Sequence, residues 1–261
     1  MKSGWLKEMW DYRELFFFMV WRDIKVRYKQ TIFGAAWAII QPFFTMVVFT
    51  LFFGRLAKMP SDGIPYPIFS YIALLPWTYF AGSLSLSGNS LVGNAHLLTK
   101  VYFPRLTLPT SAVLSGLIDF AIAFIVLLGM MAYYRVPPSW GLLLWPVLLV
   151  PLLFVALGAG MILASLNVKY RDVKYTIPFI IQLWLFLTPV IYPTSIIPDR
   201  FRILAALNPL TGIIEAFRAS IIPTKQVDWL MVGISFAIAL FILIVGVAYF
   251  RKTERAFADI I

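Results

Sequence analysis

Few side chains in this 261-residue chain could do chemistry, and their types exclude most catalytic mechanisms. There is no Cys, which excludes a thiol nucleophile, a disulfide and a Cys-bound metal, and the single His96 cannot form a His-based metal site alone. No Gly-Lys dipeptide occurs, so the loop that cradles nucleotide phosphates is absent. We therefore expect no catalytic residue, no metal and no cofactor in this chain. Any active transport would draw its energy from an ion gradient or a separate subunit.

Asp119 is the one acidic residue well inside a strongly apolar stretch. A carboxylate in a membrane needs a partner or a protonated state. A proton-coupling role is one interpretation, and a structural hydrogen bond to a neighbouring helix is the other. We favour the structural bond, because proton-driven transporters usually need a relay of such groups and none accompanies Asp119.

The composition predicts an integral membrane protein. Apolar residues make up 61% of the chain and charged residues only 13%, whereas soluble domains carry about 25% charged residues. The mean hydropathy is +0.85. The net charge of +10 comes from cations that lie between apolar runs, where they orient a membrane protein rather than bind nucleic acid.

Six apolar windows predict an all-α membrane protein with six transmembrane helices. They fall near residues 34–54, 67–92, 111–134, 141–166, 175–193 and 229–250. No cleavable signal peptide is recognisable. Segments on the side of the termini carry 15 Lys and Arg, and those on the other side carry seven. The positive-inside rule therefore predicts that both termini are cytoplasmic.

Residues 1–33 are predicted to contain an amphipathic helix that lies in the cytoplasmic membrane interface. The apolar side of its helical wheel carries Phe17, Val20, Trp21, Ile24 and Tyr28, and Arg22, Lys25, Arg27 and Lys29 lie outside that sector. The alternative is a basic helix that packs on the protein's own spans.

The connector at about 94–105 is unusually apolar for a cytoplasmic loop. Leu97, Leu98, Val101 and Tyr102 could form one side of a short helix that inserts into a groove on another protein and ends at Pro104. Simple packing against the membrane surface is the alternative. His96 is interpreted as a surface contact here.

The stretch between spans 5 and 6 is too apolar for a solvated loop, and we expect it to fold back toward the bilayer. Two short helices, at about 199–207 and 210–222, would be separated by Asn208 and Pro209. Glu215 and Arg218 stand three residues apart and are expected to pair. Re-entrant helices at an extracytoplasmic exit would satisfy this pattern.

Span 1 carries an aromatic stripe that includes Trp37, Gln41, Phe44, Val48 and Phe52 on one helical face. Such a stripe usually meets lipid or another helix. It could instead line a passage, because flat aromatic faces offer apolar contact to sugar rings without fixing them by many hydrogen bonds.

Several blocks, in order along nearly the whole chain, resemble the ABC-2 type permease subunits of bacterial polysaccharide exporters, which handle O-antigen, teichoic acid and capsule glycans. The residues that carry the resemblance are 22–31, 34, 36–37, 41–42, 100–105, 166–172, 188–192 and 207–210.

The resemblance implies a homodimeric channel in the bacterial inner membrane with two copies of a nucleotide-binding ATPase, which would bind ATP and Mg²⁺. The main ATPase contacts would be Leu97, Leu98, Lys100, Tyr102, Phe103 and Arg105, with a smaller contact at Lys169, Tyr170, Arg171 and Asp172. Asn208, Pro209, Glu215 and Arg218 would belong to an exit gate at 199–222. Trp37, Gln41, Phe44 and Phe52 would line the path of a glycan attached to a polyprenyl lipid.

Within this class, lipid-linked O-antigen is the first expectation, and teichoic acid or a capsule glycan comes next. An ABC-2 exporter of lipids or drugs would have a path with fewer aromatic side chains. A proton-coupled secondary transporter would depend on Asp119. An intramembrane enzyme is disfavoured, because no catalytic cluster is evident.

Overall fold

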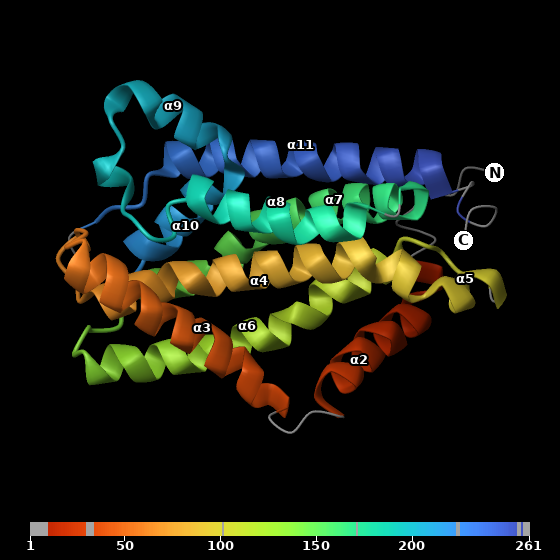
Figure 1. Cartoon of the computed structure of the whole chain (residues 1–261), viewed down its shortest axis with the longest axis horizontal. Helices are drawn as coiled ribbons and strands as arrows, with labels where there is room; N and C mark the ends of the chain where they lie inside the picture. Colours follow the sequence, from red (N-terminus) through yellow and green to blue (C-terminus); the bar gives the residue numbers. More distant parts are fainter. Residues whose placement is uncertain are drawn as a thin grey trace.

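The computed structural model describes residues 10–29, 34–100, 102–170, 172–222, 225–254 and 257. Every regular element in these ranges is a helix, and the long helices run side by side in one elongated bundle (Figure 1). In chain order the elements are α2 (Arg13–Lys29), η1 (Gly34–Ala36), α3 (Trp37–Phe49), η2 (Thr50–Leu56), α4 (Tyr66–Gly93), α5 (Ala95–Lys100), α6 (Thr107–Tyr133), η3 (Trp140–Leu144), α7 (Trp145–Lys169), α8 (Val173–Leu187), η4 (Thr194–Ile196), α9 (Asp199–Leu207), α10 (Pro209–Ala219) and α11 (Trp229–Thr253).

Within the described residues, four helical stretches are long and apolar enough to cross a membrane. They are Trp37–Leu56, Thr107–Tyr133, Trp140–Lys169 and Trp229–Thr253. The predicted second span is the 28-residue helix α4, whose Gly and Ser residues lower its hydropathy. The predicted fifth span is α8, which has only 15 residues. It ends at Leu187 instead of near residue 193, because Pro189 disfavours a helical conformation at Thr188. The full set of six spans therefore stays a prediction.

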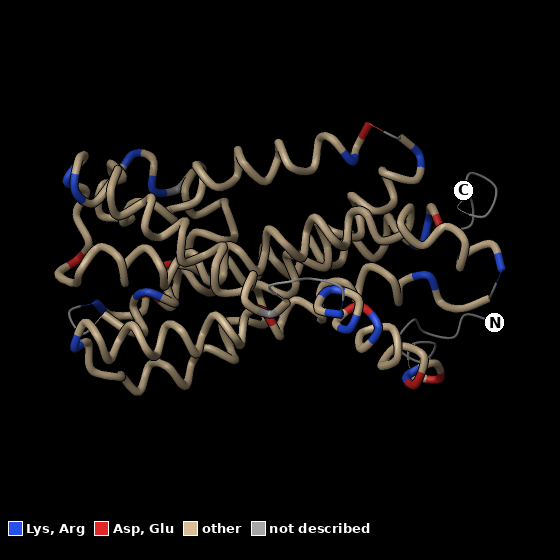
Figure 2. The backbone as a smooth tube through the Cα atoms, turned by 60° about the horizontal axis from the view of Figure 1, so that its bottom comes forward, with Lys and Arg blue, Asp and Glu red and all other residues tan. Residues whose placement is uncertain are grey.

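The bundle has two distinct ends. The short helix α5, the last turn of α7 and the last turn of α11 lie at one end, which we call the α5 end, and α9 lies at the opposite end, the α9 end (Figure 1). Lys and Arg gather at both ends and along α2, while the middle of the bundle is almost free of them (Figure 2). This distribution matches a bundle whose middle lies in hydrocarbon.

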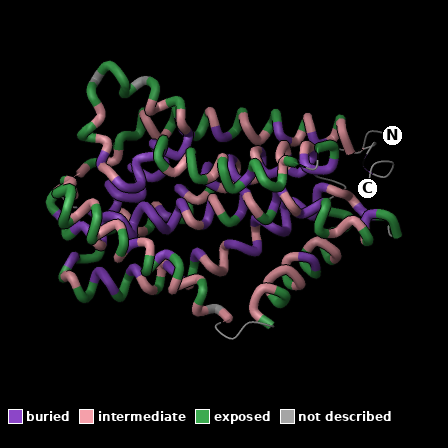
Figure 3. The backbone as a smooth tube through the Cα atoms, in the orientation of Figure 1, coloured by how far each residue is buried: buried purple, intermediate pink, exposed green. Residues whose placement is uncertain are grey.

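The main core forms around α4, which packs against α6, α7 and α10, and most residues of α4 are buried (Figure 3). Aromatic side chains fill the space between these helices. The ring centroids of Trp145 and Phe217 are 4.7 Å apart. The helices α7 and α11 approach so closely that a Cβ atom at Gly158 would lie 2.5 Å from the carbonyl oxygen of Ile242. Small residues thus set the helix spacing, as is common in membrane bundles.

A second apolar cluster lies at the α5 end and joins residues from α2, α4, α6, α7 and α11 with the loop around α5. We call it the α5-end cluster. Its buried members are Met19, Leu91, Leu98, Phe103, Leu106, Leu108, Met161, Ala164, Val168, Phe250 and Phe257. The loop between α4 and α6 is therefore an integral part of the bundle.

The segment between α8 and α11 contains two helices, as the sequence predicts. The helix α9 has the expected bounds, and α10 ends at Ala219, three residues before the expected end of the second helix. Pro209 opens α10, and the Asn208 side chain caps it by accepting a hydrogen bond from the Leu210 amide at 3.1 Å. The helix α10 is buried against α4, α7 and α11. A re-entrant position of these helices in the bilayer stays a prediction.

Candidate functional site

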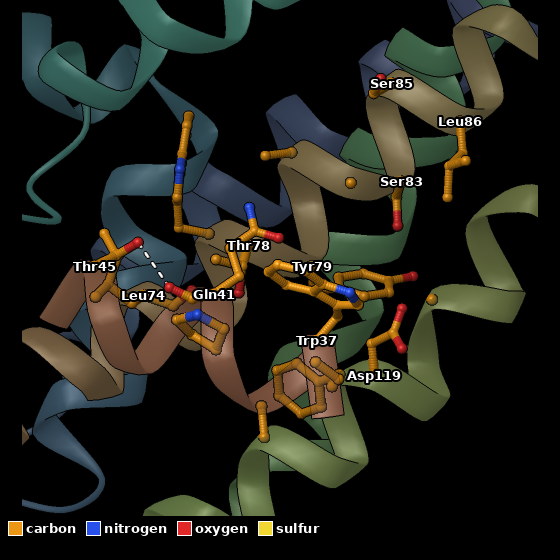
Figure 4. A pocket seen from close by; sticks show the side chains of 18 of the residues that line it. Trp37, Gln41, Thr45, Leu74, Thr78, Tyr79, Ser83, Ser85, Leu86 and Asp119 are labelled. Atoms are coloured by element: carbon orange, nitrogen blue, oxygen red, sulfur yellow. Dashed lines mark hydrogen bonds between the residues drawn. The ribbon is translucent and has the colours of Figure 1, made fainter. Parts of the chain in front are cut away.

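A cavity of about 600 Å³ opens among α2, α3, α4, α6 and α8. On α3, the side chains of Trp37, Gln41 and Thr45 are spaced four residues apart and line this cavity (Figure 4). Its other walls combine aromatic rings with hydroxyl groups, including Trp77, Thr78, Tyr79, Ser83, Ser85 and Phe120. Aromatic faces and hydroxyl groups together suit a ligand with apolar ring faces and many hydroxyls.

Two of the predicted path residues lie elsewhere. Phe44 and Phe52 do not line the cavity, and they are 62% and 58% exposed on the outer side of α3 and η2. The cavity wall continues from Gln41 to Thr45, whereas the predicted stripe continues from Gln41 to Phe44. A polar side chain thus takes the position that the aromatic pattern assigned to Phe44. The role of these residues in a passage stays a prediction.

Asp119 lies at the edge of the same cavity and has partners on α2. Its carboxylate forms an ion pair with Arg27 and accepts a hydrogen bond from the Tyr28 hydroxyl. Burial, followed by this hydrogen bond and the charge of Asp119, raises the pKa of Tyr28 above its ordinary value. The phenol therefore stays protonated and donates. The geometry provides the structural bond to a neighbouring helix that the sequence analysis favours.

Further hydrogen bonds extend this contact along both helices. The Ser111 hydroxyl donates to the Asp23 carboxylate at 2.8 Å, and Arg27 donates to the Ser115 hydroxyl at 3.1 Å. Ser111, Ser115 and Asp119 repeat every four residues, as do Asp23 and Arg27, so each set lies on one helical face. We call these five residues with Tyr28 the α2–α6 ladder. The matching four-residue spacings were the sequence signal that could have revealed it.

The ladder attaches α2 to the protein's own spans, as in the alternative interpretation of this segment, and a position in the membrane interface stays a prediction. The bundle-facing side holds Asp23 and Arg27 with the buried Met19, whereas Phe17 and Trp21 are 70% and 47% exposed. The predicted apolar face is therefore split between the bundle and the outside. The ion pair with Asp119 on α6 outweighs the solvation of Arg27. A helical wheel of α2 alone contains no information about such a partner. Residues 1–9 and 30–33 of the predicted interface segment lie outside the described residues.

The loop around α5 forms a hollow of about 220 Å³ at the α5 end. Five of the six predicted main ATPase-contact residues line it together with Thr99, namely Leu98, Lys100, Tyr102, Phe103 and Arg105. The helical part, Ala95–Lys100, is shorter than the predicted 94–105. Leu97 is half-buried against the α5-end cluster and does not line the hollow.

These loop residues fall into two groups. Leu98 and Phe103 are buried in the α5-end cluster, and Phe103 is only 5% exposed. Tyr102 is 89% exposed, and Lys100 is exposed as well. Arg105 donates a hydrogen bond to the carbonyl oxygen of Glu254 beyond α11. Leu98, Phe103 and Arg105 thus attach the loop to the bundle. The exposed group, Lys100 and Tyr102, is accessible to a partner.

The smaller predicted contact also lies at the α5 end of α7. Lys169, Tyr170 and Asp172 are exposed, and the Lys169 amino group lies 5.0 Å from the centroid of the Tyr170 ring. Arg171 lies outside the described residues. This short connector between α7 and α8 thus lies at the same end of the bundle as α5 (Figure 1).

Two of the predicted gate residues, Glu215 and Arg218, form a buried polar pair at the α9 end. Arg218 is fully buried and donates hydrogen bonds to the carbonyl oxygens of Pro189, Val190 and Tyr192 at 2.6, 2.6 and 3.0 Å. Its guanidinium also lies 3.8 Å from the centroid of the Phe69 ring. These bonds satisfy the carbonyl groups of the turn that follows α8.

The predicted Glu215–Arg218 pair is confirmed, with 3.8 Å between Nη1 and Oε2. The network also contains Lys225, which pairs with Glu215 and, at 2.8 Å, with Asp62. Sequence reasoning missed Asp62 and Lys225. They are more than 150 positions apart, and no local pattern relates them.

Asn208 fastens the start of α10 to the end of α8. Its side chain accepts a hydrogen bond from Trp184 Nε1 at 3.0 Å and donates to the Thr188 hydroxyl at 2.9 Å. Together with the Arg218 bonds, this contact fixes the turn at 188–192 against α10. The gate residues are therefore brought together in space, and the gating role stays a prediction.

Comparison with known proteins identifies the family. The sequence profile of ABC-2 type transporters matches residues 14–222. The chain belongs to this family. This ABC-2 chain is 30% identical to the O-antigen export system permease protein RfbA of Myxococcus xanthus, over 97% of this chain and 98% of that protein. It is 28% identical to the protein of the same name from Klebsiella pneumoniae, over 92% of each chain.

A more distant relative has a different cargo in its name. The polysialic acid transport protein KpsM of Escherichia coli is 23% identical, over 90% of this chain and 92% of that protein. Family membership and the apolar helices together make this chain a multi-pass membrane protein with the architecture of a permease subunit.

Proposed function

We propose that this chain is the membrane-spanning subunit of an exporter that moves a polyprenyl-lipid-linked polysaccharide of the O-antigen type across the bacterial inner membrane. The observation that carries the proposal is the similarity, over nearly the full length of both chains, to permeases named for O-antigen export. Energy would come from a separate ATPase subunit that binds ATP and Mg²⁺.

The cavity supports a glycan cargo. Trp37, Trp77, Tyr79 and Phe120 offer flat apolar faces, and the hydroxyl and amide side chains beside them can exchange hydrogen bonds with a moving sugar. A cavity of about 600 Å³ holds only a short part of a long polymer. The glycan would therefore move past this surface one sugar unit at a time.

A homodimer is part of the proposal. One chain leaves large side chains exposed on α3, η2 and α8, including Phe44, Phe52, Phe179 and Phe186. A second copy that covers such a face would enclose a path between two bundles, and its two ATPase subunits would bind at the α5 ends. A six-span arrangement with cytoplasmic termini would put α5, the 169–172 connector and the end of α11 on the ATPase side.

The α5-end cluster supports the coupling step. ATP-driven approach of the two ATPase subunits would move the exposed group of the loop, and Leu98 and Phe103 would pass the movement to five long helices at once. Packed apolar faces permit small rigid-body shifts of this kind. The network at the α9 end would then be the element that the movement opens.

Co-purification with the ATPase tests the proposal directly. We would purify the tagged chain from its native cells in mild detergent and quantify any co-purifying ATPase by mass spectrometry. Lys100→Glu should reduce the recovered ATPase at least tenfold, because the exposed Lys100 lines the hollow at the α5 end. Lys58→Glu, a change of the same charge beyond η2 in the connector to α4, is the matched control and should leave recovery unchanged.

The cargo is tested by transport in proteoliposomes. ATP-dependent translocation of a polyprenyl-linked O-antigen, but not of a lipid-linked teichoic acid or capsule glycan, would support the proposal. A stable chain that recruits no ATPase, or a complex that moves only another class of cargo, would overturn it. The similarity to KpsM makes a capsule glycan the second candidate.

A further inference from the structure

A second, apolar groove lies on the outer side of the bundle between α3, η2 and the last third of α6. It encloses about 640 Å³, which is within the range of small-molecule sites. Its floor contains the buried Met46 and Met130 and its rim the exposed Phe43 and Leu51. None of the described residues lines both this groove and the cavity that contains Asp119.

The groove has almost no capacity to bind sugar along its length. Among the described lining residues, Thr50 carries the one hydroxyl between the two ends, and that hydroxyl contacts the Met46 sulfur at 3.7 Å. Gly129 leaves open space, because a Cβ atom built there meets nothing within 4 Å. An unbranched or gently curved hydrocarbon chain fits this lining, whereas a polar chain would lose its hydration without compensation.

Polar groups gather at one end of the groove. Arg55 is exposed in the last turn of η2, and the structure gives it no hydrogen bond or ion pair with any described residue. Tyr133 and Tyr134 line the same end, where α6 finishes, and Tyr133 is 81% exposed. Because Arg55 stands at the end of a 20-residue apolar stretch, it lies at the depth of lipid headgroups.

We propose that this groove binds one anionic glycerophospholipid, with an acyl chain along Met46, Gly129 and Met130 and its phosphate at Arg55. Charge complementarity decides the occupant. A zwitterionic lipid carries a cation beside its phosphate and would gain less from Arg55 than an anionic lipid gains, and a second protein copy would need to bring an anion to a groove that is otherwise apolar. The π-helical winding of η2, a feature frequent at functional sites, holds Thr50 and Arg55, five residues apart, on the groove wall.

Native mass spectrometry of the purified full chain tests this site with two probes that share acyl chains, phosphatidylglycerol and phosphatidylcholine. The wild-type chain should bind the first phosphatidylglycerol several times more tightly than the first phosphatidylcholine. Arg55→Gln should lower that preference about fivefold, the effect of one cation near a membrane surface. Gly129→Leu should weaken binding of both lipids, because its side chain fills the groove.

Two matched variants separate this site from general effects. Lys58→Gln removes a neighbouring exposed cation that does not line the groove, and Gly233→Leu adds the same side chain to α11, where a Cβ atom also meets nothing within 4 Å. Both should bind lipid as the wild type does. Equal preference in Arg55→Gln and the wild type, or unchanged binding in Gly129→Leu, would overturn the proposal. So would tighter binding of a polyprenyl phosphate, or loss of dimers rather than of lipid in Gly129→Leu.

Discussion

The two ends of the bundle are held together by different physical interactions. At the α9 end, directional bonds dominate, because Arg218 binds three carbonyl groups and Lys225 joins Glu215 to Asp62. At the α5 end, an apolar cluster joins the loop around Phe103 to five long helices. Directional bonds fix one geometry, whereas apolar contacts tolerate small shifts. The difference fits the proposed roles of the two ends, in which the α9 end holds a turn closed and the α5 end passes on movement.

Arg218→Gln, which removes the directional bonds at the α9 end, should have the largest effect on stability. The substitution removes a fully buried cation, leaves Glu215 with less compensation and frees the carbonyl groups that Arg218 binds. Loss of one member of a buried charged pair costs about 3–5 kcal/mol. We expect a marked fall in the melting temperature of the purified protein, measured by fluorescence-detected size exclusion after heating.

Arg200→Gln is the control for that measurement. Arg200 is exposed on α9, and its guanidinium lies 4.8 Å from the centroid of the Phe201 ring. This substitution also removes one Arg from the α9 end, and it should leave the melting temperature nearly unchanged. Equal losses in the two variants would mean that net charge, rather than the bonds of Arg218, stabilises this end.

Truncation of a buried side chain at the α5 end should lower the stability somewhat less than Arg218→Gln does. Phe103→Ala removes a buried ring from the α5-end cluster, and a buried Phe→Ala change costs about 3 kcal/mol at the low end of its range. The loop can relax into part of the space, because the hollow borders it. The same heating assay should give a smaller fall than Arg218→Gln gives. A larger fall would contradict the view that this end tolerates movement.

The two ends also differ in how far the sequence predicts them. Asn208, Pro209, Glu215 and Arg218 were noticed because the rules for Pro at a helix start and for three-residue pairing are local. Lys225 and its partner Asp62 were not, because only the tertiary fold brings them together. In the same way, the apolar residues of the α5 loop were noticed, but the division between the buried Phe103 and the exposed Tyr102 depends on packing.

Element types were predicted better than the contacts between elements. Hydropathy located the long helices, and Pro189 explains why α8 is shorter than its apolar window. Packing of α2 on the protein's own spans was only the alternative interpretation, since the helical wheel treats a cation as solvated and the ion pair of Arg27 with Asp119 reverses that preference. The cavity wall at Thr45 was missed for a related reason, because the aromatic pattern outweighed the spacing from Gln41.

Asp119→Asn tests the contact between α2 and α6, which lies between the two ends of the bundle. The substitution removes the charge that pairs with Arg27 but keeps a group that can accept the Tyr28 hydrogen bond. Both charged side chains are partly exposed, at 24% for Arg27 and 31% for Asp119. Screening therefore limits the loss to about 1 kcal/mol. Cross-linking between Cys residues introduced in α2 and α6 should report looser contact of the two helices.

The same variant separates the structural role of Asp119 from proton coupling. If Asp119 is structural, ATP-driven transport in proteoliposomes should persist in Asp119→Asn, with no dependence on an imposed proton gradient. Tyr28→Phe is the companion variant, because it removes one hydrogen bond to Asp119 and keeps the ion pair. Transport that fails in Asp119→Asn while ATP hydrolysis continues unchanged would favour the proton-coupled alternative.

The smallest expected effect on stability comes from Tyr102→Ala, and it carries the sharpest test of the α5 end. Tyr102 is 89% exposed, so its removal should leave the melting temperature unchanged, unlike removal of the adjacent Phe103. If the exposed group of the loop contacts the ATPase, Tyr102→Ala should weaken ATPase binding about tenfold or more, since interface aromatic residues often contribute 2 kcal/mol. Phe103→Ala would then act mainly on the melting temperature and only secondarily on ATPase binding. Should both variants bind the ATPase equally well at permissive temperature, the loop would not be the coupling surface, and the exposed 169–172 connector would be the next surface to test.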